Sequence, residues 1–285
     1  MTMMPHFRVP VKPGAPATTA LSPRYVHAGS DFYSELARLR LLEARYDADS
    51  IRRFQALGSL RGLRCLEVGA GAGSIVRWLA SQVGSEGRAV ATDIDPRFLD
   101  DLKAENVEVR RHDIVIDDLE EDSFDIVHCR ALLLHLADPR RALERMAAAV
   151  RSGGALLVED ADYVCLRGCD PAHPLSAAFD RVMHEVLRIF ESARLFDPYF
   201  GRRLPVLVNG LGLVDCGHEA LTRVRLGGSA EAELLRRSTE RFRATILEAG
   251  TISEADFINA LSAAADPTFS FFDALSVSAW GRRRA

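Results

Sequence analysis

The chain has 285 residues, 48% hydrophobic and 27% charged, which is typical of a soluble globular protein with a substantial core. Its net charge of −4, its pI of about 6.1 and the lack of any block of five like charges argue against a nucleic-acid partner. Five cysteines, an odd number, and no run of 18 apolar residues predict reduced thiols, no membrane span and a cytoplasmic location.

Residues 1–30 are rich in proline and lack the continuous apolar stretch of a secretory signal. This pattern predicts a mobile N-terminal tail. Alternatively, Tyr25 or His27 folds over a ligand, and Tyr25 is therefore a candidate substrate contact.

Residues 31–60 carry a helical pattern, with apolar side chains recurring every three to four residues from Phe32 to Leu42. Asp49 and Ser50 predict the start of a second, short helix that ends at Gly58. We expect these N-terminal helices to form a lid over the site and to offer a surface for a homodimer.

The segment 61–160 alternates short apolar runs with amphipathic stretches. Such alternation is the signature of an α/β fold, here a Rossmann-like doubly wound sheet. The runs predict strands at 63–68, 88–95, 107–114, 124–130 and 155–160, and helices at 74–84, 96–105 and 139–152.

Residues 161–211 break this alternation with a long helical pattern at 174–193 and a short one at 202–212. We expect a helical cap inserted after the fifth strand, closing over the carboxyl ends of the strands. Residues 212–285 are then the C-terminal part of the core sheet, with strands at 213–221 and 268–283 and helices within 231–264.

The glycine-rich turn from Glu67 to Ser74, "EVGAGAGS", is the strongest motif. It contains no lysine, which excludes a phosphate-binding P-loop, and its third glycine comes one residue too early for a dinucleotide-binding turn. Glu67 would repel a pyrophosphate but suits a cationic amine. Asp93 is placed to accept hydrogen bonds from a ribose, and Asp113 from an adenine amine. S-adenosylmethionine combines these three groups.

These segments resemble class I S-adenosylmethionine-dependent methyltransferases of the small-molecule, biosynthetic type. The resemblance rests on "LEVGAGAGSIVRWLA", "AVATDID", "VRRHDI", "FDIVHCRALLLHLADP" and "VRSGGALLVED", which occur in the family's order over about residues 60–160. It implies a seven-stranded sheet with an antiparallel last strand. It also implies a set of cofactor-binding residues, namely Glu67, Gly69, Ala70, Gly71, Gly73, Asp93, Ile94, Asp113, Ile114, Cys129 and Arg130.

Catalytic and substrate-binding residues are expected where the cap meets the strand ends. A general base is needed only if the acceptor must lose a proton, and the candidates are His135, Glu159 and Asp160. The candidate substrate contacts are Tyr25, Tyr33, Tyr163, His173, Phe196 and Tyr199. Cys165, Cys169 and His173 have regular spacing but supply only three ligands, so no metal site is predicted.

The sequence therefore predicts transfer of a methyl group to O, N or C of a small molecule, in secondary metabolism, without a nucleic-acid or membrane partner. Two alternatives remain open. The same fold could use its cofactor in a cyclisation or rearrangement, or the protein could be a non-catalytic regulator that binds S-adenosylmethionine.

Overall fold

The computed structural model describes residues 31–194 and 196–285. The predictions made for residues 1–30, including the mobile tail and the contact from Tyr25, lie outside the described residues.

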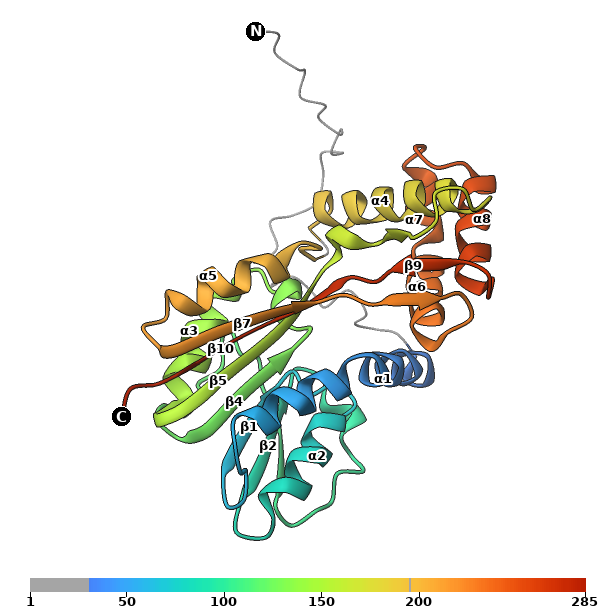
Figure 1. Ribbon diagram of the computed structural model, residues 1–285. Coiled ribbons are helices and arrows are strands. Elements are labelled where there is room, and N and C mark those ends of the chain that lie inside the picture. Colours follow the sequence, from blue (N-terminus) through green and yellow to red (C-terminus); the bar gives the residue numbers. More distant parts are fainter. Residues whose placement is uncertain (1–30, 195) are drawn as a thin grey trace, which may run out of the picture.

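A seven-stranded sheet forms the centre of the molecule (Figure 1). Its last strand in the chain, β10, runs antiparallel to both of its neighbours, whereas the strands from β3 to β5 pair in parallel. This arrangement confirms the predicted sheet. In spatial order the strands are β3 (Val107–Arg111), β2 (Arg88–Asp93), β1 (Arg64–Val68), β4 (Phe124–Arg130), β5 (Val150–Asp162), β10 (Leu275–Arg282) and β7 (Val214–Leu221).

Helices cover both faces of this sheet, so the side chains of its central strands are buried on both sides. Side chains alternate between the faces along each strand. Cys65 of β1 packs in the layer under α2 (Ser74–Val83) and the C-terminal half of α1 (Phe32–Ala56). Its neighbour Leu66 packs in the opposite layer, together with α3 (Pro139–Ala149) and α5 (Leu204–Asn209).

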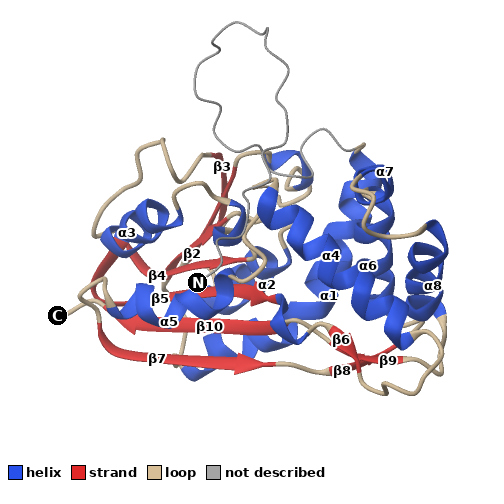
Figure 2. Cartoon of the chain, turned by 90° about the horizontal axis from the view of Figure 1, so that it is seen from above, coloured by secondary structure: helices blue, strands red, loops and turns tan. Residues whose placement is uncertain are grey.

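A second layer of helices, the cap, lies beyond the carboxyl ends of the strands (Figures 1 and 2). It consists of residues 163–193 and 222–274. Phe179, Phe257 and Phe271 from three of its elements are fully buried together. The cap contains α4 (Ser176–Ser192), α6 (Ala230–Arg241), α7 (Arg243–Glu248), α8 (Glu254–Ala265) and a small sheet in the order β6 (Arg167–Gly168), β9 (Ser270–Phe272) and β8 (Val224–Leu226).

The boundaries of the cap differ from the prediction. Of the helices within 231–264, α7 and α8 pack against α4, and α6 packs against α1 and α8; none of them packs against the core sheet. Their apolar side chains complete the cluster around Phe179. Conversely α5, predicted as part of the cap, lies on the core sheet through Leu204 and Val208. The predicted strand at 268–283 is divided between the cap (β9) and the core (β10) at Asp273, which is buried in ion pairs with Arg45 and Arg225.

The N-terminal segment forms one continuous helix, α1, so the predicted break at Asp49 and Ser50 is wrong. Both side chains are used in tertiary contacts: Asp49 pairs with Arg223 of β8, and the Ser50 hydroxyl donates to the Glu159 carboxylate of β5. A cap residue is therefore not needed at this point. The expected dimer surface on this segment stays a prediction.

The helix expected at 96–105 is also absent. Only a single turn, η1 (Pro96–Phe98), forms there. The chain after it follows successive turns that bring Leu99 and Leu102 against the glycine turn at Gly73. The other short turns are η2 (Leu133–His135), η3 (Tyr163–Cys165) and η4 (Phe200–Arg203).

Candidate functional site

A cavity of about 900 Å³ lies where the carboxyl ends of the strands, α1 and the cap meet. This volume is near the upper end of the range for small-molecule sites, ~300–1,000 Å³. Many of the residues predicted from the sequence line it together, namely Glu67, Gly69, Ala70, Gly71, Asp93, Ile94, Asp113, Ile114, Arg130, His135, Tyr163 and Phe196.

The glycine turn forms one wall of the cavity. Gly69 and Gly71 adopt left-handed backbone conformations with φ of 74° and 56°, which favour glycine. The Gly69 and Ala70 N–H groups donate to the Thr92 carbonyl at the end of β2. A Cβ atom at Gly69 would lie 3.1 Å from Leu132, so the turn is fitted closely against the loop after β4.

Asp93 stands at the end of β2 beside this turn. Its Oδ2 accepts a hydrogen bond from the Gly71 N–H at 2.9 Å, and its Oδ1 accepts one from Asp95 N–H at 2.8 Å. Burial raises the pKa of Asp93, while these backbone donors oppose the shift. The next residue, Ile94, is 52% exposed although it is apolar, so it offers a surface to a flat ligand.

Asp113 occupies the equivalent place after β3. Its Oδ1 accepts a hydrogen bond from Val115 N–H at 2.9 Å, which fixes the carboxylate at the cavity wall. Ile114 beside it is buried and belongs to the core. The four residues Asp93, Ile94, Asp113 and Ile114 form two acid–isoleucine pairs at adjacent strand ends. We name this part, with the glycine turn and Glu67, the cofactor end of the cavity.

Helix α1 covers the cofactor end. A Cβ atom at Gly71 would lie 3.5 Å from Leu39 of α1. Glu43 accepts a hydrogen bond from the Ser74 N–H at the start of α2, and Asp47 accepts one from the Ser74 hydroxyl. Asp47 also pairs with Arg130 at 2.8 Å, which ties α1 to the end of β4.

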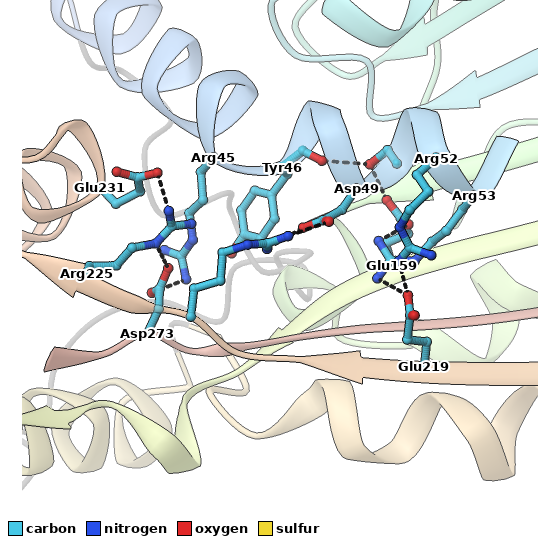
Figure 3. Close-up of polar contacts among 12 residues, drawn as sticks. Arg45, Tyr46, Asp49, Arg52, Arg53, Glu159, Glu219, Arg225, Glu231 and Asp273 are labelled. Carbon is cyan, nitrogen blue, oxygen red and sulfur yellow. Dashed lines mark hydrogen bonds and ion pairs between the residues drawn. The ribbon is translucent and has the colours of Figure 1, made fainter. Parts of the chain in front are cut away.

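Buried ion pairs attach α1 to both the core and the cap (Figure 3). Arg45 pairs with Asp273, which also binds Arg225, and Arg225 reaches Glu231 of the cap. Towards the core, Arg53 pairs with Glu159 at 2.9 Å and with Glu219 at 3.0 Å. Removal of one partner from such a buried pair typically costs ~3–5 kcal/mol, so α1 is firmly held where it lies.

Glu67 is also part of a buried ionic row. Its Oε2 lies 2.5 Å from Nδ1 of His128, directly opposite on β4, and Nε2 of His128 lies 3.4 Å from Oε2 of Glu159. Burial disfavours the charged imidazole, but the two carboxylates outweigh it and raise the pKa of His128 to about 9. Glu67 thus lines the cavity, while its carboxylate hydrogen-bonds to His128 on the side away from the cavity.

The cap end of the cavity consists of the lining residues of the cap together with His135 and Phe196. It is mostly apolar and aromatic. The ring of Phe196 lies 5.7 Å from His135, 6.1 Å from Tyr163 and 5.1 Å from Phe190. The remaining cap residues on this wall are Leu166, Met183, Val186, Leu187, Leu234, Leu235, Ser238, Thr239 and Phe242.

Charged side chains near the cap end are paired within the protein. Arg38 of α1 makes two hydrogen bonds to Glu35, and Arg45 pairs with Asp273. Burial and the positive charge of Arg38 lower the pKa of His135 to about 3, so the imidazole is neutral at physiological pH. Burial raises the pKa of Tyr163. The cap end therefore presents a largely uncharged surface.

Seven of the predicted site residues do not line the cavity: Gly73, Cys129, Glu159, Asp160, Tyr33, His173 and Tyr199. Cys129 faces the α3 layer because side chains alternate along β4. Glu159 faces the opposite layer, where Arg53, Ser50 and His128 lower its pKa to about 2 against the effect of burial. These positions fit structural roles better than ligand contacts.

The remaining residues have clear structural partners. Asp160 accepts hydrogen bonds from the Leu134 and Ala161 N–H groups, and burial raises its pKa to about 7. His173 packs on Phe269 and accepts a hydrogen bond from Leu175 N–H. Gly73 begins α2 with a left-handed φ of 84°. Tyr199 stacks with Arg202, and Tyr33 is 80% exposed.

Several residues that line the cavity, and one buried residue behind its wall, were not predicted from the sequence. Leu39, Leu42 and Tyr46 line it from α1, and the apolar periodicity of that helix was the available signal. His128 was missed although a histidine inside the apolar run "FDIVHCR" is unusual for a buried strand. The cap residues could not be assigned, because a helical pattern does not show which helix its apolar face meets.

Two further findings concern the described residues only. No group of three or more His, Cys, Asp or Glu side chains is placed to hold a metal ion among them. No helix in this part of the chain is long and apolar enough to cross a membrane.

The sheet order, the glycine turn and the paired acid–isoleucine strand ends are the features expected of a class I S-adenosylmethionine-dependent methyltransferase. Comparison with known proteins agrees. A family model described as a methyltransferase domain matches residues 66–156. This match covers about a third of the chain and identifies a methyltransferase domain in it.

Individual relatives are more distant. The chain is 28% identical over 219 residues to an uncharacterized 37.1 kDa protein of Streptomyces fradiae, covering 74% of this chain and 61% of that protein. It is 30% identical to methyltransferase str2 of Strobilurus tenacellus over half of each chain. A ubiquinone biosynthesis O-methyltransferase of Alkalilimnicola ehrlichii is 33% identical over 36% of this chain and 43% of its own length. The chain spans about half the length of these curated relatives.

Solved structures show the same fold. A phosphoethanolamine N-methyltransferase 2 of Haemonchus contortus, in complex with S-adenosylhomocysteine, has a TM-score of 0.58 and 16% identity, covering 92% of this chain and 60% of that one. The YcgJ protein of Bacillus subtilis has a TM-score of 0.53 and 18% identity, covering 84% and 99%.

Proposed function

We propose that this protein transfers a methyl group from S-adenosylmethionine to O, N or C of a small, largely apolar acceptor. The observation that carries the proposal is the continuous cavity, which has carboxylates and the glycine turn at its cofactor end and mostly apolar and aromatic side chains at its cap end. By its name, the ubiquinone-biosynthesis relative methylates a small molecule at oxygen in a biosynthetic pathway. We extend that role to secondary metabolism here.

The residues of the cofactor end fit the cofactor group by group. Asp93 offers carboxylate oxygens to a ribose diol, and Ile94 and Ile114 offer apolar surface to an adenine. Asp113 is placed to accept from the adenine amine, and Glu67 to face the amino-acid end. When bound, S-adenosylmethionine supplies a methyl group already activated by the positive charge on sulfur.

The protein's own contribution is position and enclosure. Helix α1 lies over the glycine turn, and the cap closes the other side, so an acceptor between them is held in a fixed direction and away from water. Orientation of this kind is able to lower a barrier by ~7–11 kcal/mol. No strong base is needed for that effect.

Of the three candidate catalytic residues, only His135 lines the cavity, where its ring lies beside that of Phe196. Its lowered pKa makes it a weak base. We therefore assign it to orienting the acceptor through a hydrogen bond. Acceptors whose nucleophilic atom loses its proton easily, or carries none, fit this site best.

The test combines binding and turnover. Calorimetric titration with S-adenosylmethionine is followed by incubation of labelled cofactor with a panel of phenols, amines and polyketides. A methylated product together with S-adenosylhomocysteine supports the proposal. A rearranged product without S-adenosylhomocysteine favours the cyclisation alternative, and cofactor binding without any turnover across the panel favours a regulator. Binding of a pyridine dinucleotide in place of S-adenosylmethionine overturns the proposal.

A further inference from the structure

We propose that His128 is a positioning residue that holds the Glu67 carboxylate fixed and negatively charged at the cofactor end of the cavity. His128 is fully buried in the middle of β4 and touches no part of the cavity. The proposal rests on the proposed function, because it takes Glu67 as the group that faces the amino-acid end of the cofactor.

The hydrogen-bonding geometry supports a protonated His128. Its two ring nitrogens face Glu67 on one side and Glu159 on the other. An ionised carboxylate only accepts hydrogen bonds, whereas a neutral imidazole has only one donor. Both contacts are satisfied together only when both nitrogens carry a proton, so the imidazole in this arrangement is an imidazolium.

The balance of charge in the row leads to the same conclusion. Glu67 and Glu159 contribute two negative charges, and Arg53 contributes one positive charge from α1. The four groups are neutral as a set only when His128 is also positive. The charges beyond this set balance one another: Glu219, which also contacts Arg53, pairs with Arg52, and Arg130, which donates to Ser50, pairs with Asp47. The ring of Phe54 lies 4.8 Å from the imidazole. An unpaired buried charge is costly, so this neutrality is expected to be maintained.

The ionic row of Glu67, His128 and Glu159 also fixes the orientation of the Glu67 carboxylate. Glu67 and His128 are opposite each other in the parallel register of β1 and β4, and Glu159 follows on β5. The imidazolium holds one oxygen of Glu67, which leaves the carboxylate a single orientation towards the cavity. A carboxylate held in advance binds a cationic amine without the cost of ordering a free side chain.

The experiment compares two ligands that differ only at the amino-acid end. S-adenosylhomocysteine carries the amino group, and 5′-methylthioadenosine retains the nucleoside but lacks the amino-acid head. Dissociation constants are measured by calorimetry at pH 7.5 for the unmodified protein, His128→Gln, Glu67→Gln and the double variant. His218→Gln, an exposed histidine on β7, is the matched control.

We expect His128→Gln to weaken S-adenosylhomocysteine binding about tenfold, as loss of a charge-assisted hydrogen bond does, and to change 5′-methylthioadenosine binding by less than about twofold. The double variant should be no weaker than Glu67→Gln alone, because both changes break the same contact. Equal weakening of both ligands indicates a merely structural role and overturns the proposal, as does no change in either.

A second measurement covers the case in which His128→Gln does not fold. Nitrogen NMR of the unmodified protein, labelled at histidine, should show both His128 ring nitrogens protonated at pH 7.5. A neutral imidazole there overturns the proposal. If the unmodified protein binds neither nucleoside, the proposed function fails; if it binds both and the variants behave like it, only the role of His128 fails.

Discussion

The cofactor end of the cavity and its cap end hold their side chains in different ways. At the cofactor end, the carboxylates of Asp93 and Asp113 are fixed by backbone N–H groups of the residues next to each strand end. At the cap end, apolar and aromatic side chains from two separate segments pack on one another, and the charged groups nearby are already paired.

The difference matches two kinds of recognition. A carboxylate held by backbone N–H groups has one fixed orientation, which suits a ligand that is the same in every reaction, such as a cofactor. Packed apolar side chains tolerate substitution if their total volume is kept, so a wall of this kind is able to accept different shapes. We infer that the core determines which cofactor binds and the cap determines which acceptor binds. Asp93→Ala and Phe196→Leu test this division directly, and two further predictions concern Asp160 and His135, which lie between the two ends.

The largest expected effect is at the cofactor end. Asp93→Ala removes both carboxylate oxygens from the proposed ribose site, and hydrogen bonds to a charged group contribute ~1.5–3 kcal/mol each. S-adenosylmethionine affinity measured by calorimetry should fall about a thousandfold. Asp100→Ala, an exposed aspartate outside the cavity, is the control and should leave the affinity unchanged. A loss of less than tenfold for Asp93→Ala would contradict the assignment.

Asp160 supports the turn η2 between the two ends, and its pKa gives a prediction about stability. Burial raises that pKa from 3.8 to about 7, so the folded state holds the proton more tightly than the unfolded chain does. The contribution of Asp160 to stability therefore decreases as the pH rises from about 4 to 7, by roughly 4 kcal/mol.

Asp160→Asn should remove this dependence. Denaturant unfolding of both proteins between pH 4 and 8 isolates the effect, because other titrating groups cancel in the difference. A difference that stays constant with pH would show that the pKa of Asp160 is the same in the folded and the unfolded protein, and would contradict the prediction.

A change at the cap end should affect the acceptor and leave the cofactor alone. Phe196→Leu loses ring contacts with Tyr163 and Phe190, and aromatic pairs contribute ~0.5–1.5 kcal/mol each. The kcat/KM for the acceptor should fall about tenfold while S-adenosylmethionine affinity changes less than twofold. Tyr199→Leu, just outside the cavity, serves as the matched control. Equal losses in acceptor and cofactor binding would break the proposed division.

The smallest effect concerns His135. Its pKa of about 3, lowered by burial and by Arg38, keeps the imidazole neutral across the usual assay range. The pH profiles of kcat/KM for the unmodified protein and His135→Asn should therefore have the same shape between pH 6 and 8, even if the rates differ. An inflection in this range that disappears in the variant would identify His135 as a titrating base.

Most residues predicted for the cofactor end do lie together in the cavity, because the sequence signals there are local. Gly69 and Gly71 lie in one turn, and Asp93 and Asp113 directly follow recognisable strands, so chain order alone places them at one edge of a parallel sheet. The prediction was wrong where it depended on which face of a strand a side chain occupies. Cys129 was placed at the site, but it faces away.

The cap end could not be predicted in the same way. The helical patterns at α4, α6 and α8 were recognised, but their partners are determined by contacts between residues far apart in the chain, such as Phe179 and Phe257. The break expected at Asp49 and Ser50 was wrong for a related reason. Both residues suit a helix start, but each finds a distant partner, Arg223 and Glu159, that only the folded chain supplies.

The division of the cap into two segments has a consequence for how specificity could be exchanged between relatives. β9 lies between β6 from one segment and β8 from the other, and α4 packs on α8 across the same boundary. A recombination event with one crossover between residues 193 and 222 would combine the first cap segment of one parent with the second cap segment of another. Their contact surfaces would then come from different proteins and would not be complementary. We therefore expect a working chimera to need both cap segments from the same parent, whereas α5 and β7 between them can stay unchanged.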